Sequence, residues 1–369
     1  MSKLIDEMKK NKKLSDLIIK DVVKDEWLST NVMSVNLLFS GKIRGGIKKG
    51  KISVCAADSQ QGKSLIGLNV LRSAYKAGMD CFVIDTEHAF NYSLAQELGI
   101  NLDDIVVYDT AKIPEIKQIF GQINHGLTRE ESRNVFVLLD SWGPIVTAQV
   151  MDKAEEASSA VDMSMPKFKN ELANVINACG NTVFVVNHVY ASLQMYGEKF
   201  EIPGGKRLFF NADAIMLASS AAKYKDAEGS VLGKVITAGV KKGRSAKEFV
   251  KTHFLIRHDG GLDPFYGLLD EACDSGVVVK PKNGCYTRPD YDKDGKTWKE
   301  NELYCSAFWV PLYKDPAFNE FLEKKFAFED SKLISATEDV FDMIDGKTEL
   351  STESLPTAEP DSEDDDEDK

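Results

Sequence analysis

The sequence predicts an α/β fold with a mostly parallel sheet, and three observations lead to this expectation. An apolar run at residues 52–56 is followed by a polar loop and then by apolar residues at helical spacing, which gives the order strand, loop, helix. Three more short apolar runs, at 81–85, 135–139 and 182–186, each end in polar or acidic residues. The chain has 369 residues and an ordinary hydrophobic content of 43%, which suits one large domain with appendages.

The segment before this core has a character of its own. Residues 1–30 predict a short amphipathic helix that is basic and separate from the core, so we expect it to pack on something other than its own core. A link at residues 27–50 carries a short apolar run and ends in glycine-rich turns, SGKIRGGIKKG.

The loop at residues 57–64, ADSQQGKS, has the features of a phosphate-binding loop. Backbone N–H groups at a helix start lie at the positive end of the helix dipole and can surround phosphate oxygens. Lys63 would place a positive charge on the β and γ phosphates, and Ser64 would offer a hydroxyl to Mg²⁺. Ala57 replaces the first glycine of the motif, which is tolerable if that residue keeps a negative φ. A chance Gly-Lys-Ser in a surface turn is the alternative, and the loop alone indicates an NTPase of unspecified kind.

Three residues that follow the later apolar runs are candidates for the chemistry. Glu87 could orient and deprotonate a water, and a helix N-cap for residues 89–98 is the alternative. Asp140 stands where a carboxylate holds Mg²⁺ downstream of a phosphate loop. His188 could sense the γ-phosphate, and a histidine that merely caps a strand is the alternative.

Two long stretches, at 149–166 and 190–210, predict no regular structure, and long loops in a compact domain are commonly functional. The second, YASLQMYGEKFEIPGGKRLFF, interleaves aromatic residues with Lys199, Lys206 and Arg207. This mixture suits insertion between bases and contact with the phosphates of a single strand. A lid over a small-molecule site is the alternative.

The remaining segments complete the predicted architecture. Further strands are expected at residues 211–218 and 235–240. From Leu262 onward, a helix at 267–275, a strand-like VVVK, the segment FWV and a last helix at 318–328 predict a small α/β appendage.

The composition of the chain indicates the cellular compartment in which it works. No apolar run approaches the length of a membrane span, and the charged start does not resemble a secretory signal. The six cysteines are scattered without a C-x-x-C or a Cys/His cluster, which favours free thiols in a reducing compartment over disulfides or zinc. The sequence therefore predicts a protein of the cytoplasm, the host cytoplasm if it is viral, with no membrane partner.

The net charge of −12 lies almost wholly in the C-terminal tail. Residues 329–369 hold 16 acidic residues and 3 lysines, so the rest of the chain is close to neutral and is free to carry a local basic groove. The tail is either a solubilising segment without structure or an anionic mimic that competes with DNA for the protein's own basic surface.

The order of these motifs resembles a known family. An N-terminal helix, SG-x-x-x-GG, the phosphate loop, VIDTEHA, VLLDS, VVNH and a Gly-Gly loop together resemble a RecA-type recombinase core. The stretches DGGLDPFYGLLDEACDSGVVVKPKNGCY and FWVPLYKDPAF are similar to the UvsX-type recombinases of tailed phages, and KPKNG is specific to that branch. The resemblance covers about residues 30–330.

The resemblance implies roles in nucleotide binding and hydrolysis. Glu87 matches the family's catalytic glutamate, and Lys63 and His188 complete the implied catalytic set, with His188 as the γ-phosphate sensor that moves a DNA loop. Asp140 matches the Mg²⁺-associated aspartate, acting with Ser64. The implied nucleotide-binding residues are Asp58, Ser59, Gln60, Gln61, Gly62, Lys63, Ser64 and Leu65.

The resemblance also implies contacts with other molecules. Lys242 and Arg244, in VKKGR, match the basic pair that reaches the ATP of the neighbouring subunit, as an arginine finger does in trans. Residues 149–166 and 190–205 match the two DNA loops. The implied DNA-binding residues in and around them are Lys167, Lys169, Tyr190, Met195, Tyr196, Lys199, Phe200, Gly204, Gly205, Lys206 and Arg207.

Two further implications concern the base and the duplex. Where relatives stack a tyrosine on adenine this chain has Leu94, with Tyr92 two residues earlier, so we expect loose discrimination between nucleotides. The appendage would contact duplex DNA, although a solvated polar face explains its basic residues equally well; those residues are Lys280, Lys282, Arg288 and Lys296.

The implied activity is ATP-dependent strand exchange, with ATP and Mg²⁺ as cofactors. The implied partners are single-stranded DNA, a homologous duplex, further copies of the chain in a helical filament, a single-strand-binding protein and a recombination mediator. The implied divisions are a protomer-docking segment at 1–30, an ATPase core at 31–262, a small domain at 263–330 and an acidic tail at 331–369.

Two other classes share much of this pattern. A RecA-core helicase or another DNA motor ATPase has the same phosphate loop, catalytic acid and Mg²⁺ aspartate. A DNA-binding paralogue without hydrolysis would keep only the fold, and the presence of Lys63, Ser64, Glu87 and Asp140 argues against it.

Overall fold

The computed structural model describes residues 25–147, 150, 164–191, 200–201, 205–226, 228–292 and 295–328. The described residues belong to one compact unit. Several predicted features lie outside the described residues: most of the N-terminal helix, most of the loop at 149–166, the tail at 331–369, and Met195, Tyr196, Lys199 and Gly204. The predicted division into four segments stays a prediction.

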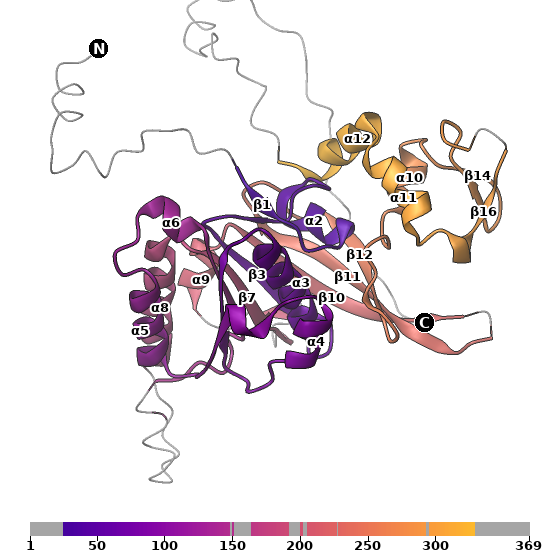
Figure 1. Cartoon of the computed structure of the whole chain (residues 1–369). Helices are drawn as coiled ribbons and strands as arrows, with labels where there is room; N and C mark the ends of the chain where they lie inside the picture. Colours follow the sequence, from indigo (N-terminus) through magenta and orange to yellow (C-terminus); the bar gives the residue numbers. More distant parts are fainter. Residues whose placement is uncertain are drawn as a thin grey trace, which may run out of the picture. The chain divides into compact units, whose positions relative to one another are not determined.

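A nine-stranded sheet forms the centre of the molecule, and the mostly parallel α/β fold is confirmed (Figure 1). Its order is β13-β12-β11-β10-β3-β7-β6-β4-β5. The six strands from β10 to β5 are parallel, and β11, β12 and β13 add an antiparallel edge. The bounds are β3 (Ile52–Ala57), β4 (Asp80–Asp85), β5 (Ile105–Asp109), β6 (Val135–Asp140), β7 (Thr182–His188), β10 (Ala214–Lys225), β11 (Val231–Gly243), β12 (Lys251–Arg257) and β13 (Gly261–Leu262).

The four apolar runs of the sequence all become central strands of this sheet. Every residue of β3 is buried, as are all of β6 except Asp140. Continuous rather than alternating burial follows because helices cover both faces of the parallel part. The strands predicted at 211–218 and 235–240 are β10 and β11. Strand β10 begins at Ala214, three residues later than predicted, and continues to Lys225, whereas β11 extends beyond both predicted bounds.

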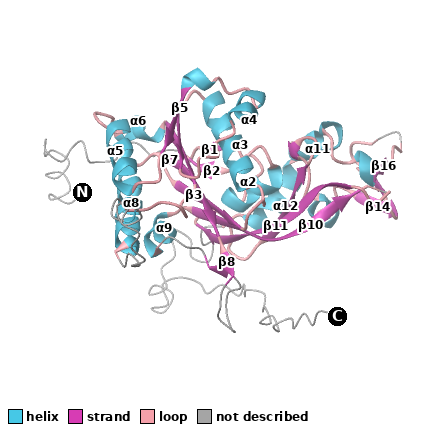
Figure 2. Ribbon diagram, turned by 90° about the horizontal axis from the view of Figure 1, so that it is seen from below, coloured by secondary structure: helices cyan, strands magenta, loops and turns pink. Residues whose placement is uncertain are grey.

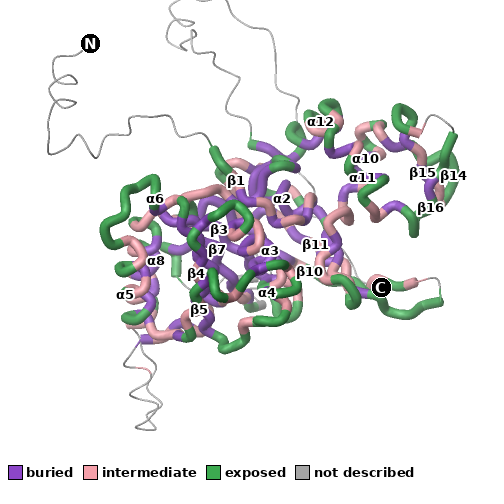
Figure 3. Tube along the Cα trace, in the orientation of Figure 1, coloured by how far each residue is buried: buried purple, intermediate pink, exposed green. Residues whose placement is uncertain are grey.

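Helices cover the sheet on its two faces (Figure 2). Side chains such as Leu38, Ile66 and Ala95 pack on one face, and Phe120 and Leu172 pack on the other, which buries the strands between them (Figure 3). The first group of helices is α2 (Met33–Ser40), α3 (Lys63–Lys76) and α4 (Tyr92–Glu97), and the second is α5 (Ile113–Ile123), α8 (Met165–Cys179) and α9 (Lys206–Asn211).

Short elements connect these layers. They are β1 (Trp27–Leu28) paired with β2 (Ile47–Lys48), a 3₁₀ turn η2 (Leu102–Asp104), α6 (Arg129–Arg133), and β8 (Tyr190–Ala191) paired with β9 (Phe200–Glu201). No helix within the described ranges is long and apolar enough to cross a membrane.

The C-terminal part of the unit has its own apolar cluster. Trp298, Phe308, Trp309 and Phe318 pack there with Leu37 of α2. The elements are α10 (Leu269–Asp274), β14 (Val279–Lys282), β15 (Cys285–Thr287), β16 (Trp298–Lys299), η3 (Glu300–Glu302), α11 (Ser306–Tyr313) and α12 (Pro316–Phe326).

Arg288 lies against the aromatic rings of this cluster, and its expected contact with duplex DNA is wrong. The side chain is buried and forms an ion pair with Asp292, with Nη2 to Oδ1 at 2.7 Å. Its Nη1 also donates to the Phe308 carbonyl oxygen at 2.6 Å, and its guanidinium lies 5.0 Å from the centre of the Trp298 ring. A buried guanidinium needs such partners, so this one stabilises the fold and is not free for phosphate.

Candidate nucleotide-binding and hydrolysis site

The carboxyl ends of four parallel strands bring the predicted catalytic residues together. In the register of the sheet, Ala57 of β3 pairs with His188 of β7, and Asp85 of β4 pairs with Asp140 of β6. Since β7 and β6 lie between β3 and β4, residues far apart in the chain meet at one edge of the sheet. Such an edge is where ligands bind in open α/β sheets.

The phosphate loop joins β3 to α3 as the sequence predicts. Ala57 is the last residue of β3 and lies in extended strand, so its position does not require glycine. Gly62 is the N-cap of α3 with φ +82°, and a Cβ there would lie 2.6 Å from Ile256 Cδ1, so this position does require glycine. No described side chain caps α3, which leaves the N–H groups of its first turn to an anion.

Lys63 lies inside this loop and is only 6% exposed. Its Nζ donates to the carbonyl oxygens of Ala57 at 3.0 Å and Asp58 at 2.7 Å. Burial lowers the pKa of Lys63, while the nearby carboxylates of Asp140 and Glu87 act in the opposite direction. The ammonium is therefore positioned by the loop that would surround the phosphates.

Ser64 and Asp140 supply a pair of oxygen ligands next to Lys63. The Ser64 side chain is exposed and hydrogen-bonds to the Asp140 carboxylate. Burial raises the pKa of Asp140 to about 6, against the lowering effect of the Ser64 hydrogen bond. Within the described residues no group of three or more His, Cys, Asp or Glu could hold a metal. A hydroxyl and one carboxylate fit Mg²⁺, which commonly takes one or two protein ligands and completes its shell with phosphates and waters.

Glu87 lies near Asp140 and is held by two neighbours. Ser141 Oγ donates to Glu87 Oε1 at 2.6 Å, and His188 Nε2 lies 2.7 Å from the same oxygen. Burial raises the pKa of Glu87, but the hydrogen bonds from Ser141 and His188 and the nearby Lys63 outweigh it and lower the pKa overall. Both hydrogen bonds end on Oε1, so Oε2 is the oxygen that could accept a proton from water.

Asp85 and Asn91 take the capping role that was the alternative for Glu87. The Asp85 carboxylate accepts from the backbone N–H of Glu87 at 3.1 Å and from those of Ala89 and Phe90 at 2.8 Å. Asn91 is the N-cap of α4 and accepts from Leu94 N at 2.9 Å. The capping interpretation of Glu87 is therefore wrong.

Thr86 and Ser141, which help His188 to hold Glu87 in place, were not among the predicted site residues. Thr86 Oγ1 donates to the Ser141 carbonyl oxygen and accepts from Ser141 N, both at 2.7 Å, so the ends of β4 and β6 are locked together. The only available signal was a hydroxyl beside each carboxylate, in DT at 85–86 and DS at 140–141.

The expected base-binding position is not available for stacking. Leu94 packs against the apolar cluster beneath α4. Tyr92 is 53% exposed at the first position of the same helix, with its ring edge-on to Phe90 at 4.9 Å between centroids. Tyr92 is therefore the aromatic side chain that an incoming base can reach in this segment.

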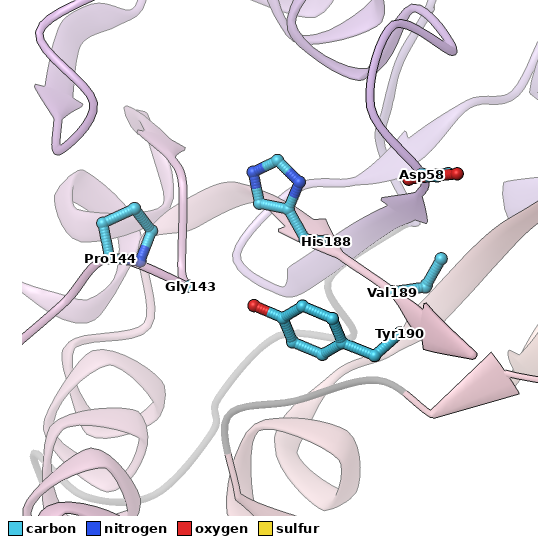
Figure 4. A pocket seen from close by; sticks show the side chains of 6 residues that line it. All are labelled: Asp58, Gly143, Pro144, His188, Val189 and Tyr190. Carbon is cyan, nitrogen blue, oxygen red and sulfur yellow. The ribbon is translucent and has the colours of Figure 1, made fainter. Parts of the chain in front are cut away.

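A pocket of about 430 Å³ lies between the phosphate loop and the segment that follows β7 (Figure 4). Its lining residues are Asp58, Gly143, Pro144, His188, Val189 and Tyr190. The Tyr190 side chain is 61% exposed and its ring extends toward Gly143. The pocket thus joins the catalytic edge to the start of the DNA loop predicted at 190–205.

Several predicted DNA-binding residues lie at the amino ends of α8 and α9. Lys167, Lys206 and Arg207 are exposed, and Gly205 precedes α9. The two helices touch, and the Arg207 backbone N–H donates to Asn170 Oδ1 at 3.1 Å. Three exposed cations therefore share one region, next to the predicted loops. Phe200 lies in β9.

Lys169 is the exception, because its assignment to DNA is wrong. It is 9% exposed, and its Nζ donates to the carbonyl oxygens of Trp142 at 3.2 Å and Gly143 at 2.9 Å. Burial lowers the pKa of this ammonium. Lys169 therefore links α8, which follows the loop predicted at 149–166, to Trp142 and Gly143, which precede that loop.

Replacing Lys169 by methionine should lower ATP turnover roughly 10- to 100-fold, the usual cost when a contact that supports a site is lost. Methionine keeps much of the buried stem but removes both hydrogen bonds to the segment that carries Ser141. Steady-state turnover and thermal unfolding measure the effect. The matched control is Lys117→Met, which removes a half-exposed lysine paired with Glu171 of α8 at 3.1 Å. Equal turnover in the two variants would contradict the positioning role.

Of the pair expected to act on a neighbouring subunit, the Lys242 side chain is hydrogen-bonded within its own chain. Lys242 Nζ donates to the carbonyl oxygens of Phe209 at 2.7 Å and Phe210 at 2.9 Å, at the end of α9. Arg244 is exposed, and its charge lies near the buried carboxylate of Asp213. The pair is thus placed beside α9, away from this chain's own Glu87 in sheet order.

Comparison with known proteins agrees with this geometry. A family model described as the RecA N-terminal domain matches residues 4–263, and a model of the C-terminal domain of the bacteriophage T4 recombination and repair protein matches residues 265–322. The recombination and repair protein of Enterobacteria phage T4 is 27% identical over 347 residues, which cover 89% of this chain and 85% of that protein.

Bacterial relatives match a shorter part of the chain. Protein RecA of Ruminococcus albus is 27% identical over 239 residues, 64% of this chain and 58% of that protein, and Protein RecA of Rhodopirellula baltica is 27% identical over 255 residues, 68% and 65%. The chain thus matches less than two thirds of each of these RecA proteins, and the match to the T4 protein extends further. The resemblance stated from the motifs is confirmed: this chain belongs to the RecA family of recombinases, which are DNA-dependent ATPases, and carries a C-terminal domain of the phage T4 type.

Proposed function

We propose that this chain hydrolyses ATP at the carboxyl edge of its parallel sheet and uses that cycle to exchange DNA strands. The observation that carries the proposal is the position of Glu87, hydrogen-bonded to Ser141 and His188 within the site that also holds Lys63 and Asp140. A carboxylate kept ionised by its neighbours next to a phosphate loop is the arrangement that positions a water for attack on a γ-phosphate.

Different residues of this site would bind the phosphates, hold Mg²⁺ and activate the water. The N–H groups of the loop and the first turn of α3 bind phosphate oxygens, and Lys63 supplies a localised positive charge. Ser64 and Asp140 would hold Mg²⁺, which would neutralise charge on the phosphates when bound. Glu87 would orient the water and take its proton, and His188 would hold Glu87 and report on the state of the site to Tyr190 and the loop beyond it.

The DNA-binding surface is proposed at the amino ends of α8 and α9. Lys167, Lys206 and Arg207 present exposed charge there, and Tyr190 presents an exposed ring at the rim of the pocket. Proteins that bind single-stranded nucleic acid commonly combine cations that contact phosphates with aromatic rings that stack on bases. The affinity of this chain for single-stranded DNA should therefore fall as the salt concentration rises. Duplex DNA is the proposed second substrate, with Lys280, Lys282 and Lys296 of the C-terminal part as candidates.

Assembly is proposed to complete the site. Lys242 and Arg244 would reach the ATP bound to a neighbouring copy, so that hydrolysis depends on a filament. A heterologous contact of this kind does not close on itself and builds a helix of subunits. The further proposed partners are a single-strand-binding protein and a recombination mediator. The proposed compartment is the cytoplasm of the host.

The test is the ATP turnover rate with and without single-stranded DNA, with the same samples viewed by negative-stain microscopy. The proposal expects turnover that DNA stimulates, together with helical filaments of variable length. Stimulated turnover with closed rings would instead identify a motor of the helicase type. Absent turnover and absent assembly would identify a paralogue that keeps the fold without the chemistry.

A further inference from the structure

Phe249 combines high exposure with a left-handed backbone conformation. Its side chain is 89% exposed, more than any other large hydrophobic side chain in the described part. Its φ is +68°, in the left-handed region that disfavours residues with a Cβ. The strained backbone costs free energy, and the exposed ring gains no compensating burial within its own chain. A contact with another molecule would supply that compensation.

The turn that carries Phe249 is held firmly between β11 and β12. Phe249 N donates to the Val240 carbonyl oxygen at 3.2 Å, and Val240 N donates to the Val250 carbonyl oxygen at 3.0 Å. Lys247 N also donates to the Phe326 carbonyl oxygen at 2.7 Å, at the end of α12.

A second set of contacts fixes the other side of this turn. Phe328 N donates to the Ser245 carbonyl oxygen at 2.8 Å, and Ala246 forms an isolated antiparallel bridge with Ala327. The strain at Phe249 is therefore imposed by a rigid frame, and the ring is presented in a fixed direction.

The charges around Phe249 identify the kind of partner. The same turn begins with Arg244 and carries Lys247 and Lys251, against one acid, Glu248. The nucleotide edge of the sheet has the opposite character, with exposed carboxylates at Asp58 and at Asp109, which contacts His88, and the half-exposed Glu87. A triphosphate would add further negative charge to this edge when bound. A basic turn on one molecule is thus complementary to the acidic nucleotide edge of another copy of the same chain.

We propose that Phe249 is an apolar anchor by which one copy of this chain binds the nucleotide edge of the next. The inference rests on the proposed function, in which Lys242 and Arg244 act on the neighbour's ATP, because Phe249 follows Arg244 on the same rigid turn. A central aromatic side chain flanked by charge is the usual composition of an interface hot spot. The strained conformation is then stabilised only in the assembled state.

The test uses substitutions that separate strain from contact. Asparagine tolerates the left-handed region and glycine favours it, so Phe249→Asn and Phe249→Gly should unfold at the same temperature as the wild type or higher. Both should raise the protein concentration required for filament assembly by about 30-fold, the effect expected for losing a hot-spot side chain. Sedimentation velocity over a concentration series with ATP and single-stranded DNA measures this directly.

Two further variants make the result specific. Phe249→Tyr keeps the ring and should assemble like the wild type. Leu127→Asn removes an apolar side chain of 37% exposure ahead of α6, away from the turn, and should leave the assembly concentration unchanged.

Each other outcome overturns the inference in a recognisable way. If the wild type assembles and Phe249→Asn assembles equally well, Phe249 is not an anchor, and the proposed function stands. A clearly lower unfolding temperature in Phe249→Gly would mean that the ring packs on its own chain. A wild type that stays monomeric with ATP and DNA would overturn the proposed function and the anchor with it.

Discussion

Lys63→Ala should lower ATP turnover by at least about 100-fold, the cost of losing one preorganised group that stabilises developing charge on a reacting oxygen. The ammonium is already positioned by the carbonyl oxygens of Ala57 and Asp58, and alanine carries no charged group to take its place. DNA-stimulated turnover at saturating ATP measures the effect, and nucleotide binding measured by fluorescence separates weaker binding from slower chemistry.

The fold should survive this substitution. Removing Lys63 leaves two carbonyl oxygens at the loop without this donor, which destabilises the fold by about 1–3 kcal/mol at most. Removal also relieves a charge that burial disfavours, as the lowered pKa of Lys63 indicates. Lys76→Ala is the matched control, since it removes an exposed lysine from the last turn of the same helix. Near-normal turnover in Lys63→Ala would contradict the assignment of the phosphate loop.

The central sheet could be predicted from sequence because its strands are buried on both faces. Residues 52–56 and 135–139 are continuous apolar runs, and such runs followed by an acid or a small polar loop have few structural interpretations. The antiparallel strand β12 was missed because Lys251 and His253 leave only a short apolar run in a strand close to the edge of the sheet. Helix α8 was missed because proline and lysine residues at its start resemble the loop before it.

The site was predictable where one residue type indicates one chemistry. Gly62, Lys63 and Ser64 have a fixed spacing and stand where that spacing requires, and the structure places Glu87 and His188 together at 2.7 Å. The sequence pattern could not predict which charged side chains are buried and hydrogen-bonded within the chain.

Lys169 and Arg288 show this limit most clearly. Both are cations in segments that resemble DNA-binding sequence, yet both are buried and bonded within the chain. Burial depends on contacts between distant segments, and a single sequence carries no record of them. The same holds for Ser141, whose role depends on β4 and β6 being neighbours in the sheet.

Glu87→Gln should lower ATP turnover by roughly 100- to 10,000-fold, the range that general acid–base catalysis contributes. Glutamine keeps an oxygen that can accept from Ser141 and His188, so the local structure should persist while the negative charge and the basic oxygen are lost. Nucleotide binding and DNA-dependent assembly should therefore remain. The expected result is a filament that holds ATP far longer than the wild type, seen as slow single-turnover hydrolysis together with filaments that persist on single-stranded DNA.

This substitution also separates catalysis from structure, because Glu87 links three strand ends. Glu97→Gln is the matched control: it removes an exposed carboxylate from the end of α4 and should not change turnover. Unaltered hydrolysis in Glu87→Gln would exclude Glu87 as the group that activates water. Loss of both assembly and thermal stability would assign Glu87 a structural role through Ser141 and His188. Slow hydrolysis with intact assembly is the one outcome that requires the carboxylate for the chemical step itself, because the hydrogen bonds of the side chain to Ser141 and His188 are preserved.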